Sequence, residues 1–364
     1  MTPLIIDAHL DLAYNAQNFK RDYRHGVATM RKLEEGQMPE KVNGECTVGY
    51  PDMMRGHVGL AFGTIFVEPA KSGMAASDKG YTTTYRDAAE AHAQGMAQLD
   101  YYYRLADQEP RIRLVTTRKD LEEVVAQWHP NPTAVKPIRR QIGLVPLMEG
   151  ADPIREPKEL ERWVERGIRI VGLAWSETRY SGGTRAPGGL TKIGFELLDM
   201  MAQYGTILDL SHMAEKAVFQ ALEHFEGKHI IASHSNPQKI TPTDRHLPDR
   251  AIEILAERGG VMGVVLFNAF LKYDWNRGKK HEVTLDHVLR CVDHVCQLTG
   301  NANHVGIGSD FDGGFGRTAI PNELDSIRDL HKIGDMLSQH GYSAFDIENI
   351  MGGNWLRVLR GALK

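Results

Sequence analysis

Eight short stretches of the chain are largely apolar. Continuous apolar runs of this length are typical of strands that are covered on both faces, as in a parallel sheet. The stretches span residues 3–11, 57–67, 142–148, 168–174, 206–211, 229–233, 260–266 and 304–309. The pattern therefore predicts eight buried strands that are spread over the whole length of the chain.

Amphipathic segments with a helical period lie between these strands. They cover residues 84–105, 121–127, 157–166, 194–204, 214–224, 248–258 and 284–298. Strand followed by helix, repeated along the chain, is the pattern of a (β/α)8 barrel. A doubly wound sheet is the structural alternative, but no glycine-rich phosphate-binding turn follows any of the strands. We therefore expect a single α/β domain over residues 1–364, a (β/α)8 TIM barrel.

Two intervals are longer than a simple barrel connection requires. Residues 67–142 are polar and include a long helical pattern and a proline-rich loop at 129–137, and we interpret them as an extended second βα unit. Residues 176–192 are rich in glycine. Because connecting segments run over the surface, we expect this second interval to form a loop over the mouth of the barrel.

Composition and charge exclude several classes of function. The chain has 364 residues, of which 42% are hydrophobic and 25% charged, and its formal net charge is −4. No lysine- and arginine-rich run is present, so no nucleic acid is expected as a partner. No apolar segment approaches the roughly 20 residues that span a bilayer, and the amino terminus lacks the regions of a signal peptide. We expect a soluble, cytoplasmic protein with no membrane partner.

The first strand ends in a His-x-Asp motif, His9-Leu10-Asp11. Side chains alternate along a strand, so His9 and Asp11 are expected on the same face. An imidazole beside a carboxylate is a good pair of ligands for a divalent metal. Taken alone, however, the motif is more simply explained by a hydrogen-bonded core histidine and an aspartate that begins a turn.

Further metal-competent side chains follow four other predicted strands. They are Glu149 after the third strand, His212 after the fifth, His234 after the sixth and Asp310 after the eighth. In a (β/α)8 barrel these positions meet at the carboxyl-terminal mouth, where the active sites of this fold lie. Six such residues at five strand ends predict a site for zinc or a similar first-row ion. One catalytic ion uses about three protein ligands, so the number favours two ions that share a carboxylate and a water molecule.

The order and spacing of these motifs resemble those of the membrane dipeptidase (renal dipeptidase) family, which are metallopeptidases with an amidohydrolase-like barrel. The resemblance extends from Asp7-Ala8-His9-Leu10-Asp11 to Met351-Gly352-Gly353-Asn354-Trp355 and thus covers nearly the whole chain. It implies an amidohydrolase-like barrel with extended βα loops, two zinc ions per subunit and a homodimer.

The resemblance also assigns roles to the strand-end residues. It implies that His9 and Asp11 hold one zinc ion, and that His212 and His234 hold the other. Glu149 would bridge the two ions. Asp310 would contact the amino end of the substrate and shuttle a proton.

Arg245 lies in a second motif of the family, Asp244-Arg245-His246-Leu247-Pro248-Asp249. In the family this motif supplies an arginine that binds the free carboxylate of the substrate. A guanidinium group suits that role because it can donate two parallel hydrogen bonds to one carboxylate. Without the resemblance, a surface arginine ahead of a helix is the simpler interpretation.

Two positions depart from the family pattern. Trp175 stands where the fourth strand of the family ends in a histidine that polarises the scissile carbonyl, and Phe270 stands where a tyrosine is expected. An indole N–H donates a hydrogen bond but carries no positive charge. Candidate replacement donors lie in the glycine-rich loop that follows, at Arg179, Tyr180 and Arg185. Alternatively, Trp175 forms an aromatic wall that favours a different substrate side chain.

The resemblance and the predicted metal site together indicate a zinc-dependent dipeptidase. Its substrates would be dipeptides with a free carboxyl end, L-Xaa-L-Xaa or L-Xaa-D-Xaa, attacked by a metal-bridged hydroxide. One alternative is a binuclear amidohydrolase that acts on another amide, such as an N-acyl amino acid or a lactam. A lyase or isomerase on the same barrel and a non-catalytic metal-binding barrel are the others. No Gly-x-Ser-x-Gly elbow supports acyl-enzyme chemistry.

Overall fold

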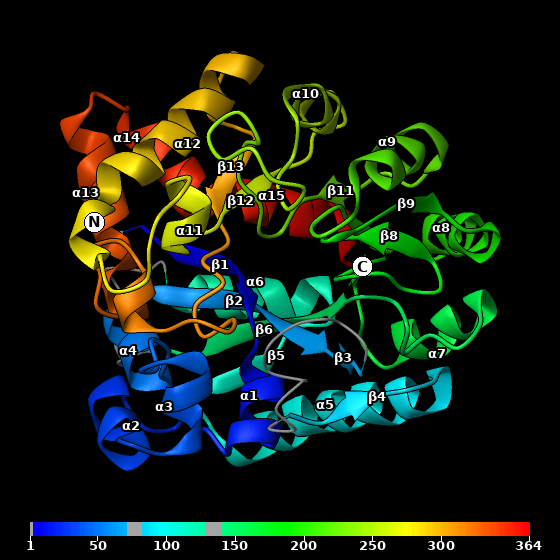
Figure 1. Ribbon diagram of the computed structural model, residues 1–364, viewed down its shortest axis with the longest axis horizontal. Coiled ribbons are helices and arrows are strands. Elements are labelled where there is room, and N and C mark those ends of the chain that lie inside the picture. Colours follow the sequence, from blue (N-terminus) through cyan, green and yellow to red (C-terminus); the bar gives the residue numbers. More distant parts are fainter. Residues whose placement is uncertain (1–2, 71–81, 129–139) are drawn as a thin grey trace.

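Eight parallel strands form a barrel in the computed structural model, which describes residues 3–70, 82–128 and 140–364 (Figure 1). In their order around the sheet the strands are β11 (Ile230–Ile231), β10 (Ile207–Asp209), β7 (Ile170–Gly172), β6 (Ile142–Glu149), β2 (Val58–Phe66), β1 (Ile5–Leu10), β13 (Val305–Ile307) and β12 (Met262–Val264). An isolated parallel bridge between Ala232 and Met262 joins the two ends of this sheet. The eight predicted strands and the (β/α)8 barrel are confirmed.

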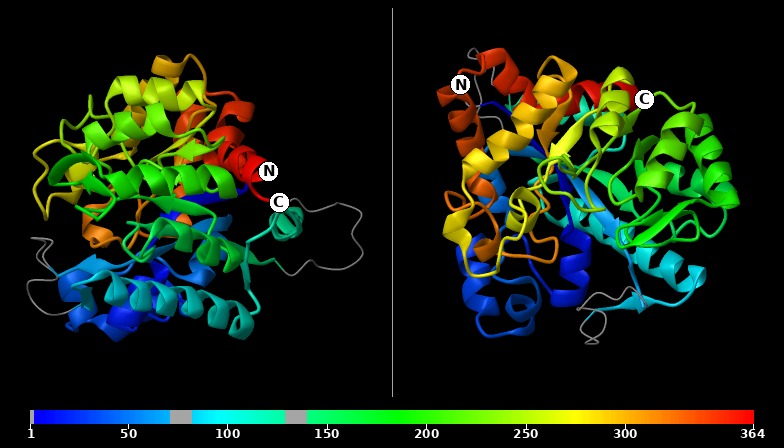
Figure 2. Two further views of the ribbon diagram at one scale, coloured as in Figure 1. Left: turned by 90° about the vertical axis from the view of Figure 1, so that its right-hand side faces the viewer. Right: turned by 45° about the horizontal axis from the view of Figure 1, so that its top comes forward.

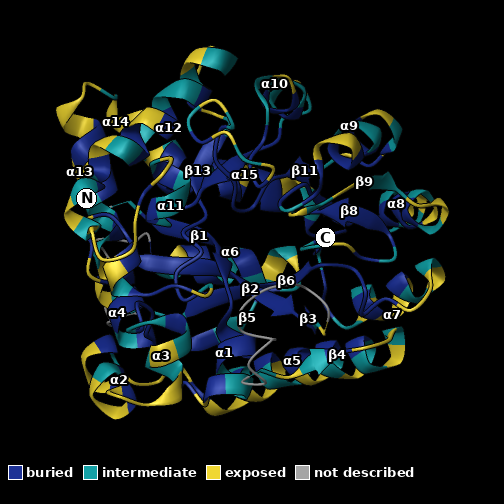
Figure 3. Cartoon of the chain, viewed as in Figure 1, coloured by how far each residue is buried: buried dark blue, intermediate teal, exposed yellow. Residues whose placement is uncertain are grey.

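Helices surround the barrel on its outside, as the two further views show (Figure 2). The helices that match the seven predicted segments are α5 (Ala88–Gln108), α6 (Arg118–Trp128), α7 (Leu160–Glu165), α8 (Lys192–Tyr204), α9 (Glu215–His224), α10 (Asp249–Glu257) and α12 (Leu285–Thr299). Their inner faces are buried and their outer faces exposed (Figure 3). Helix α5 begins later than predicted because Asp87 caps it, accepting hydrogen bonds from the backbone N–H groups of Ala89 and Glu90.

Several short elements are not predicted by the sequence pattern. They are α1 (Leu12–Phe19), α2 (Val27–Glu34), α3 (Met38–Asn43), α4 (Tyr50–Arg55), β3 (Glu68–Pro69), β4 (Thr84–Tyr85), β5 (Ile112–Leu114), α11 (Asn268–Leu271), α13 (His331–Gln339), α14 (Ala344–Glu348) and α15 (Asn354–Ala362). Most are too short to repeat a helical or strand period often enough to be recognised. The segment predicted at 157–166 is also divided, because it opens with the 3₁₀ turn Pro157–Glu159.

The glycine-rich interval at 176–192 is not the loop that the sequence predicts. It forms an antiparallel hairpin of β8 (Ser181–Gly183) and β9 (Ala186–Leu190). Strand β8 also pairs with the segment that follows His212, through a bridge between Gly183 and Met213. The proline-rich loop at 129–137 lies outside the described residues.

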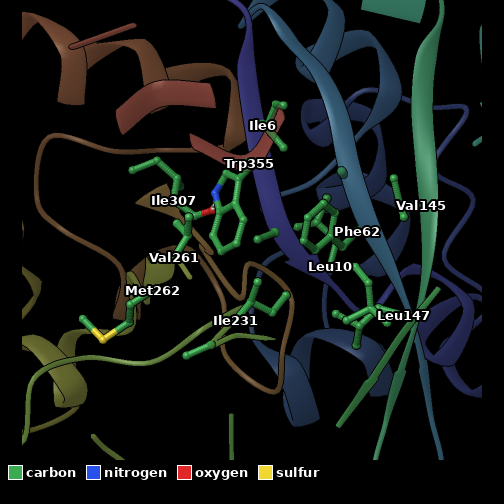
Figure 4. Close-up of a cluster of buried hydrophobic side chains, with 14 of the residues drawn as sticks. Ile6, Leu10, Phe62, Val145, Leu147, Ile231, Val261, Met262, Ile307 and Trp355 are labelled. Carbon is green, nitrogen blue, oxygen red and sulfur yellow. Dashed lines mark hydrogen bonds between the residues drawn. The ribbon is translucent and has the colours of Figure 1, made fainter. Parts of the chain in front are cut away.

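The carboxyl-terminal helix is fixed to the barrel by Trp355 (Figure 4). This fully buried indole packs edge-on against Phe62 of β2, with ring centres 5.4 Å apart, and its N–H donates to the Ile307 carbonyl of β13 at 3.1 Å. A Cβ at Gly306 would lie 2.4 Å from the indole nitrogen, so only glycine leaves room for the ring. None of the helices in the described part of the chain has the length and apolar character needed to cross a membrane.

Candidate metal centre

Glu149 stands at the centre of the predicted site, as the last residue of β6. Its Oε2 atom lies 3.4 Å from His9 Nε2. Its Oε1 atom lies 3.0 Å from His212 Nε2 and 3.3 Å from His234 Nε2. One buried carboxylate therefore divides the three histidines into two groups, one at each of its oxygens.

The two aspartates lie on the His9 side of this carboxylate. His9 Nε2 is 3.9 Å from Asp11 Oδ1 and 4.0 Å from Asp310 Oδ1. His9, Asp11 and Asp310 offer ligand atoms that all lie within 4.8 Å of one another, as do His9, Glu149 and His234. The structure thus brings all six strand-end residues together at the mouth of the barrel.

Strand alternation alone does not explain how His9 and Asp11 meet. The register between β1 and β2 shifts between Asp7 and Leu10, which marks a bulge around His9. Asp11 follows the strand and is the N-cap residue of α1, yet its side chain makes no capping hydrogen bond. Its Oδ1 instead accepts a hydrogen bond from Thr64 Oγ1 of β2 at 2.7 Å. The carboxylate is therefore turned toward the metal centre and not toward the helix.

His234 has a hydrogen-bonded support behind it. Ser233 Oγ donates to Asp209 Oδ2 at 2.5 Å and lies 2.9 Å from His234 Nδ1. A hydroxyl group has one proton, so the second contact must be a hydrogen bond donated by Nδ1–H of the imidazole. The Nε2 atom of His234 then carries a lone pair that faces the site, which is the usual arrangement behind a metal-bound histidine.

His212 is supported from the β8–β9 hairpin. Thr184 Oγ1 lies 3.0 Å from His212 Nδ1 and 3.4 Å from the His212 carbonyl oxygen. If the hydroxyl donates to that carbonyl, it accepts from Nδ1–H, and the Nε2 lone pair again faces Glu149. Sequence reasoning missed these supporting residues, although Asp209 and Ser233 are visible as polar interruptions in apolar runs.

The donor set fits a divalent metal. His212 Nε2 and His234 Nε2 are 3.0 Å apart, and both face Glu149 Oε1. Three acceptors at this distance repel one another unless a cation or a proton lies between them. Both ring nitrogens of His9 are also buried without a hydrogen-bond partner among the described residues. Imidazole and carboxylate groups in this arrangement suit zinc or another first-row ion.

The pKa values of the buried histidine and carboxyl groups are consistent with metal binding. Burial, with the Arg245 charge added, lowers the pKa of His212 to about 4, so this imidazole is neutral near pH 7. Burial opposes ionisation of Glu149, but the neighbouring histidines outweigh it and hold its pKa well below the ordinary value. Burial raises the pKa of Asp310 well above its ordinary value, and the negative charges of Asp11 and Glu149 add to this effect.

Comparison with known proteins identifies the family. The sequence model described as "Membrane dipeptidase (Peptidase family M19)" matches residues 2–363. The chain belongs to this family. It is therefore a metallo-dipeptidase, a hydrolase that cleaves small peptides, and membership of a metallopeptidase family implies a metal cofactor.

Several known proteins are similar to this chain. An uncharacterised protein of Klebsiella pneumoniae, from the region 5′ of pqqA, is 31% identical over 229 residues, which are 60% of this chain and 82% of its own length. Dipeptidase TcpJ of Claviceps purpurea is 28% identical over 326 residues, 86% of this chain and 69% of its own. A metallopeptidase of Rhodobacter sphaeroides, crystallised with a phosphinate mimic of L-Ala-D-Ala, shares the fold at 24% identity, with a TM-score of 0.77 over 100% of both chains.

Arg245 of the dipeptidase lies close to the predicted metal ligand His234. It is 5% exposed, and its Nη2 donates to the His234 carbonyl oxygen at 2.8 Å. Its guanidinium carbon lies 5.5 Å from the centre of the Phe270 ring. The arginine is thus a buried residue beside the site and not the surface arginine of the simpler interpretation.

Trp175 follows β7 and forms part of an aromatic wall. Its ring centre lies 4.8 Å from that of Phe66 and 6.3 Å from that of His212. Two of the candidate replacement donors are engaged elsewhere. Arg179 pairs with Asp152 at 3.1 Å, and the Tyr180 hydroxyl donates to the Ile154 carbonyl. Neither therefore reaches the metal centre, whereas Arg185 lies in the hairpin and donates its backbone N–H to Asp244.

Proposed function

We propose that this dipeptidase uses two zinc ions to hydrolyse dipeptides with a free carboxyl end, L-Xaa-L-Xaa or L-Xaa-D-Xaa. The observation that carries the proposal is the position of Glu149, whose two oxygens face separate groups of histidines. A carboxylate in that position is suited to bridge two ions. His9 and Asp11 would hold one ion, and His212 and His234 the other.

Bound metal would lower the pKa of a shared water molecule and polarise the scissile carbonyl. Asp310 supplies the acid–base function. Its Oδ1 lies on the His9 side of the centre, and its raised pKa allows it to hold a proton between two steps. Oδ1 would take a proton from the attacking water and pass it to the leaving amine.

Two further residues would orient the substrate. Arg245 would bind the free carboxylate, since its buried guanidinium has N–H groups without a hydrogen-bond partner among the described residues. Trp175 would form the wall against which a substrate side chain packs, together with Phe66. The enzyme would then prefer short peptides, because the distance between Arg245 and the metals limits the length that fits.

Metal removal tests the proposal directly. Chelation is expected to abolish hydrolysis of L-Ala-L-Ala, and activity should return in proportion to added Zn²⁺ up to about two equivalents per chain. Metal analysis of the reconstituted protein gives the count. An active metal-free protein would refute the proposal, and full activity with one equivalent would refute the two-ion form of it.

In the family pattern a histidine that could assist the peptide carbonyl stands at the position of Trp175. Its replacement by an indole favours a competing substrate class, N-acyl amino acids and lactams. A panel of L-Xaa-L-Xaa and L-Xaa-D-Xaa dipeptides, N-acyl amino acids and lactams separates the two. The proposal expects the highest kcat/KM for a dipeptide. A higher value for an N-acyl amino acid or a lactam would assign the chain to the broader class of binuclear amidohydrolases.

A further inference from the structure

His246, the neighbour of Arg245, is a buried imidazole with one unused proton. The residue is only 4% exposed. Its Nδ1 accepts a hydrogen bond from the backbone N–H of Asn236 at 3.3 Å, so the ring proton resides on Nε2. That Nε2 has no hydrogen-bond partner among the described residues. Burial, with the positive charge of Arg245 added, lowers the pKa of His246 well below its ordinary value, so the ring is neutral.

Arg245 adds further unused donors next to this imidazole. Its Nη2 is taken by the His234 carbonyl, but Nε and Nη1 are buried and have no partner in the described part of the chain. Phe270 packs against both residues, with its ring centre 5.5 Å from the guanidinium carbon of Arg245 and 4.9 Å from the ring centre of His246. A phenyl ring offers no lone pair, so Phe270 contacts both residues without accepting a hydrogen bond from either.

Buried donors without an acceptor lower the stability of the folded protein. A carboxylate removes that cost, because its two oxygens accept about four hydrogen bonds. We infer that His246 is a second residue for binding the substrate carboxylate, donating Nε2–H beside the unused N–H groups of Arg245. The inference rests on the proposed dipeptidase function. It adds the uncharged donor His246 Nε2–H to the charged donors of the neighbouring Arg245.

An uncharged donor has a specific consequence. Arg245 attracts the negative charge of the carboxylate, whereas His246 requires an acceptor at one defined position. A carboxamide would present its own N–H₂ group to one of these donors and leave it unsatisfied. His246 therefore contributes to the selection of a free acid over an amide, separately from the charge of Arg245.

Binding of one probe in two forms tests the inference. The probe is the phosphinate mimic of L-Ala-D-Ala, used as the free acid and as its carboxamide, in calorimetric titrations of the zinc-loaded protein. H246L removes the donor and is expected to weaken binding of the free acid roughly tenfold or more, with a change of less than about twofold for the carboxamide. H246Q retains an N–H and should recover part of the affinity.

The control variant is H304L. His304 is also partly buried, but its Nδ1 is paired with the Gly260 carbonyl oxygen at 2.9 Å, ahead of β13 at the opposite end of the barrel. This variant should bind both probes as the unmodified protein does. Thermal unfolding of all variants shows whether each is folded at the temperature of the titration.

The two hypotheses fail in different ways. Equal losses for the free acid and the carboxamide in H246L, or no loss for either, would overturn the role of His246. Hydrolysis of dipeptides by the unmodified protein would still support the proposed function in that case. An unmodified protein that neither binds the free-acid probe nor cleaves dipeptides would overturn both.

Discussion

At the residue scale, His212 and Asp310 share a backbone conformation that most side chains avoid. Their φ angles are +66° and +60°. This left-handed region costs free energy for residues other than glycine, and such strain gathers at functional sites where the surrounding structure enforces it. Both residues follow barrel strands and point to the same metal centre, so the strained turns set the direction of the side chains that the chemistry needs.

The role of Asp310 can be tested at this scale by D310N. Asparagine tolerates the left-handed conformation and keeps the size of the side chain, but it does not exchange protons. We expect metal content and thermal stability to be retained, while kcat falls by about 10²–10⁴. The measurement is steady-state hydrolysis of L-Ala-L-Ala together with metal analysis.

Asp249 provides the matched control for this prediction. It pairs with His294 at 2.8 Å, between helices α10 and α12, and this pair is partly exposed. D249N should therefore leave kcat within about twofold, in line with the small effects of exposed ion pairs. Similar activity of D310N and D249N would remove the proposed acid–base role.

At the scale of the element, the β8–β9 hairpin supports His212, one of the proposed metal ligands. Thr184 at its turn contacts His212, and the Ala214 N–H donates to the Gly182 carbonyl of β8 at 3.1 Å. The hairpin also reaches the motif of Arg245, since the Arg185 N–H donates to Asp244 at 2.7 Å. One short hairpin thus connects the loop of a proposed metal ligand with the loop that is proposed to bind the carboxylate.

Two glycines that face each other in this hairpin differ in how much space they have. A Cβ at Gly182 would lie 2.6–2.8 Å from backbone atoms of Gly188, whereas a Cβ at Gly188 would come no closer than 3.5 Å to Gly182. G182A should displace the hairpin, lower stability by about 1–3 kcal/mol and reduce metal occupancy. G188A should change neither quantity appreciably. Thermal unfolding and metal analysis of both variants measure this, and equal effects would show that the hairpin does not depend on this contact.

At the scale of the whole molecule, a buried ionic cluster joins the amino-terminal helices to the loop after β13. Arg21 contacts Glu34 at 3.0 Å and Asp312 at 3.3 Å, and its side chain is fully buried. Asp312 also accepts hydrogen bonds from the backbone and side chain of Thr47, at 2.7 and 2.8 Å. Asp312 is two residues from Asp310, so this cluster holds the loop that carries the proposed acid–base residue.

Removal of the Arg21 charge should destabilise the protein strongly. R21M would leave Glu34 and Asp312 buried without a counter-charge, which costs about 3–5 kcal/mol. R24M is the matched control, because Arg24 is 53% exposed and pairs with Asp22 on the surface at 2.7 Å. The control should cost no more than about 1 kcal/mol. Urea denaturation gives both free energies of unfolding, and comparable values would contradict a structural role for the cluster.

The amino-acid sequence by itself determined the repeated strand and helix pattern and the position of each proposed ligand along it. Both are local properties, since burial on two faces leaves an apolar run and a helix leaves a period of about 3.6 residues. The eight strands and the outer helices could therefore be predicted. Glu149, His212 and His234 could be placed at strand ends because a barrel brings the carboxyl ends of its strands to one mouth.

Only the tertiary structure decided how these residues are held. The bulge at His9, the contact of Thr64 with Asp11 and the contact of Thr184 with His212 join segments that are far apart in the chain. The same holds for the unused donors of His246 and its neighbour, which become significant only because folding buries them. The periodicity of a sequence indicates whether a residue is buried. It does not indicate which distant group the residue contacts, because that contact depends on strand register and on packing between elements.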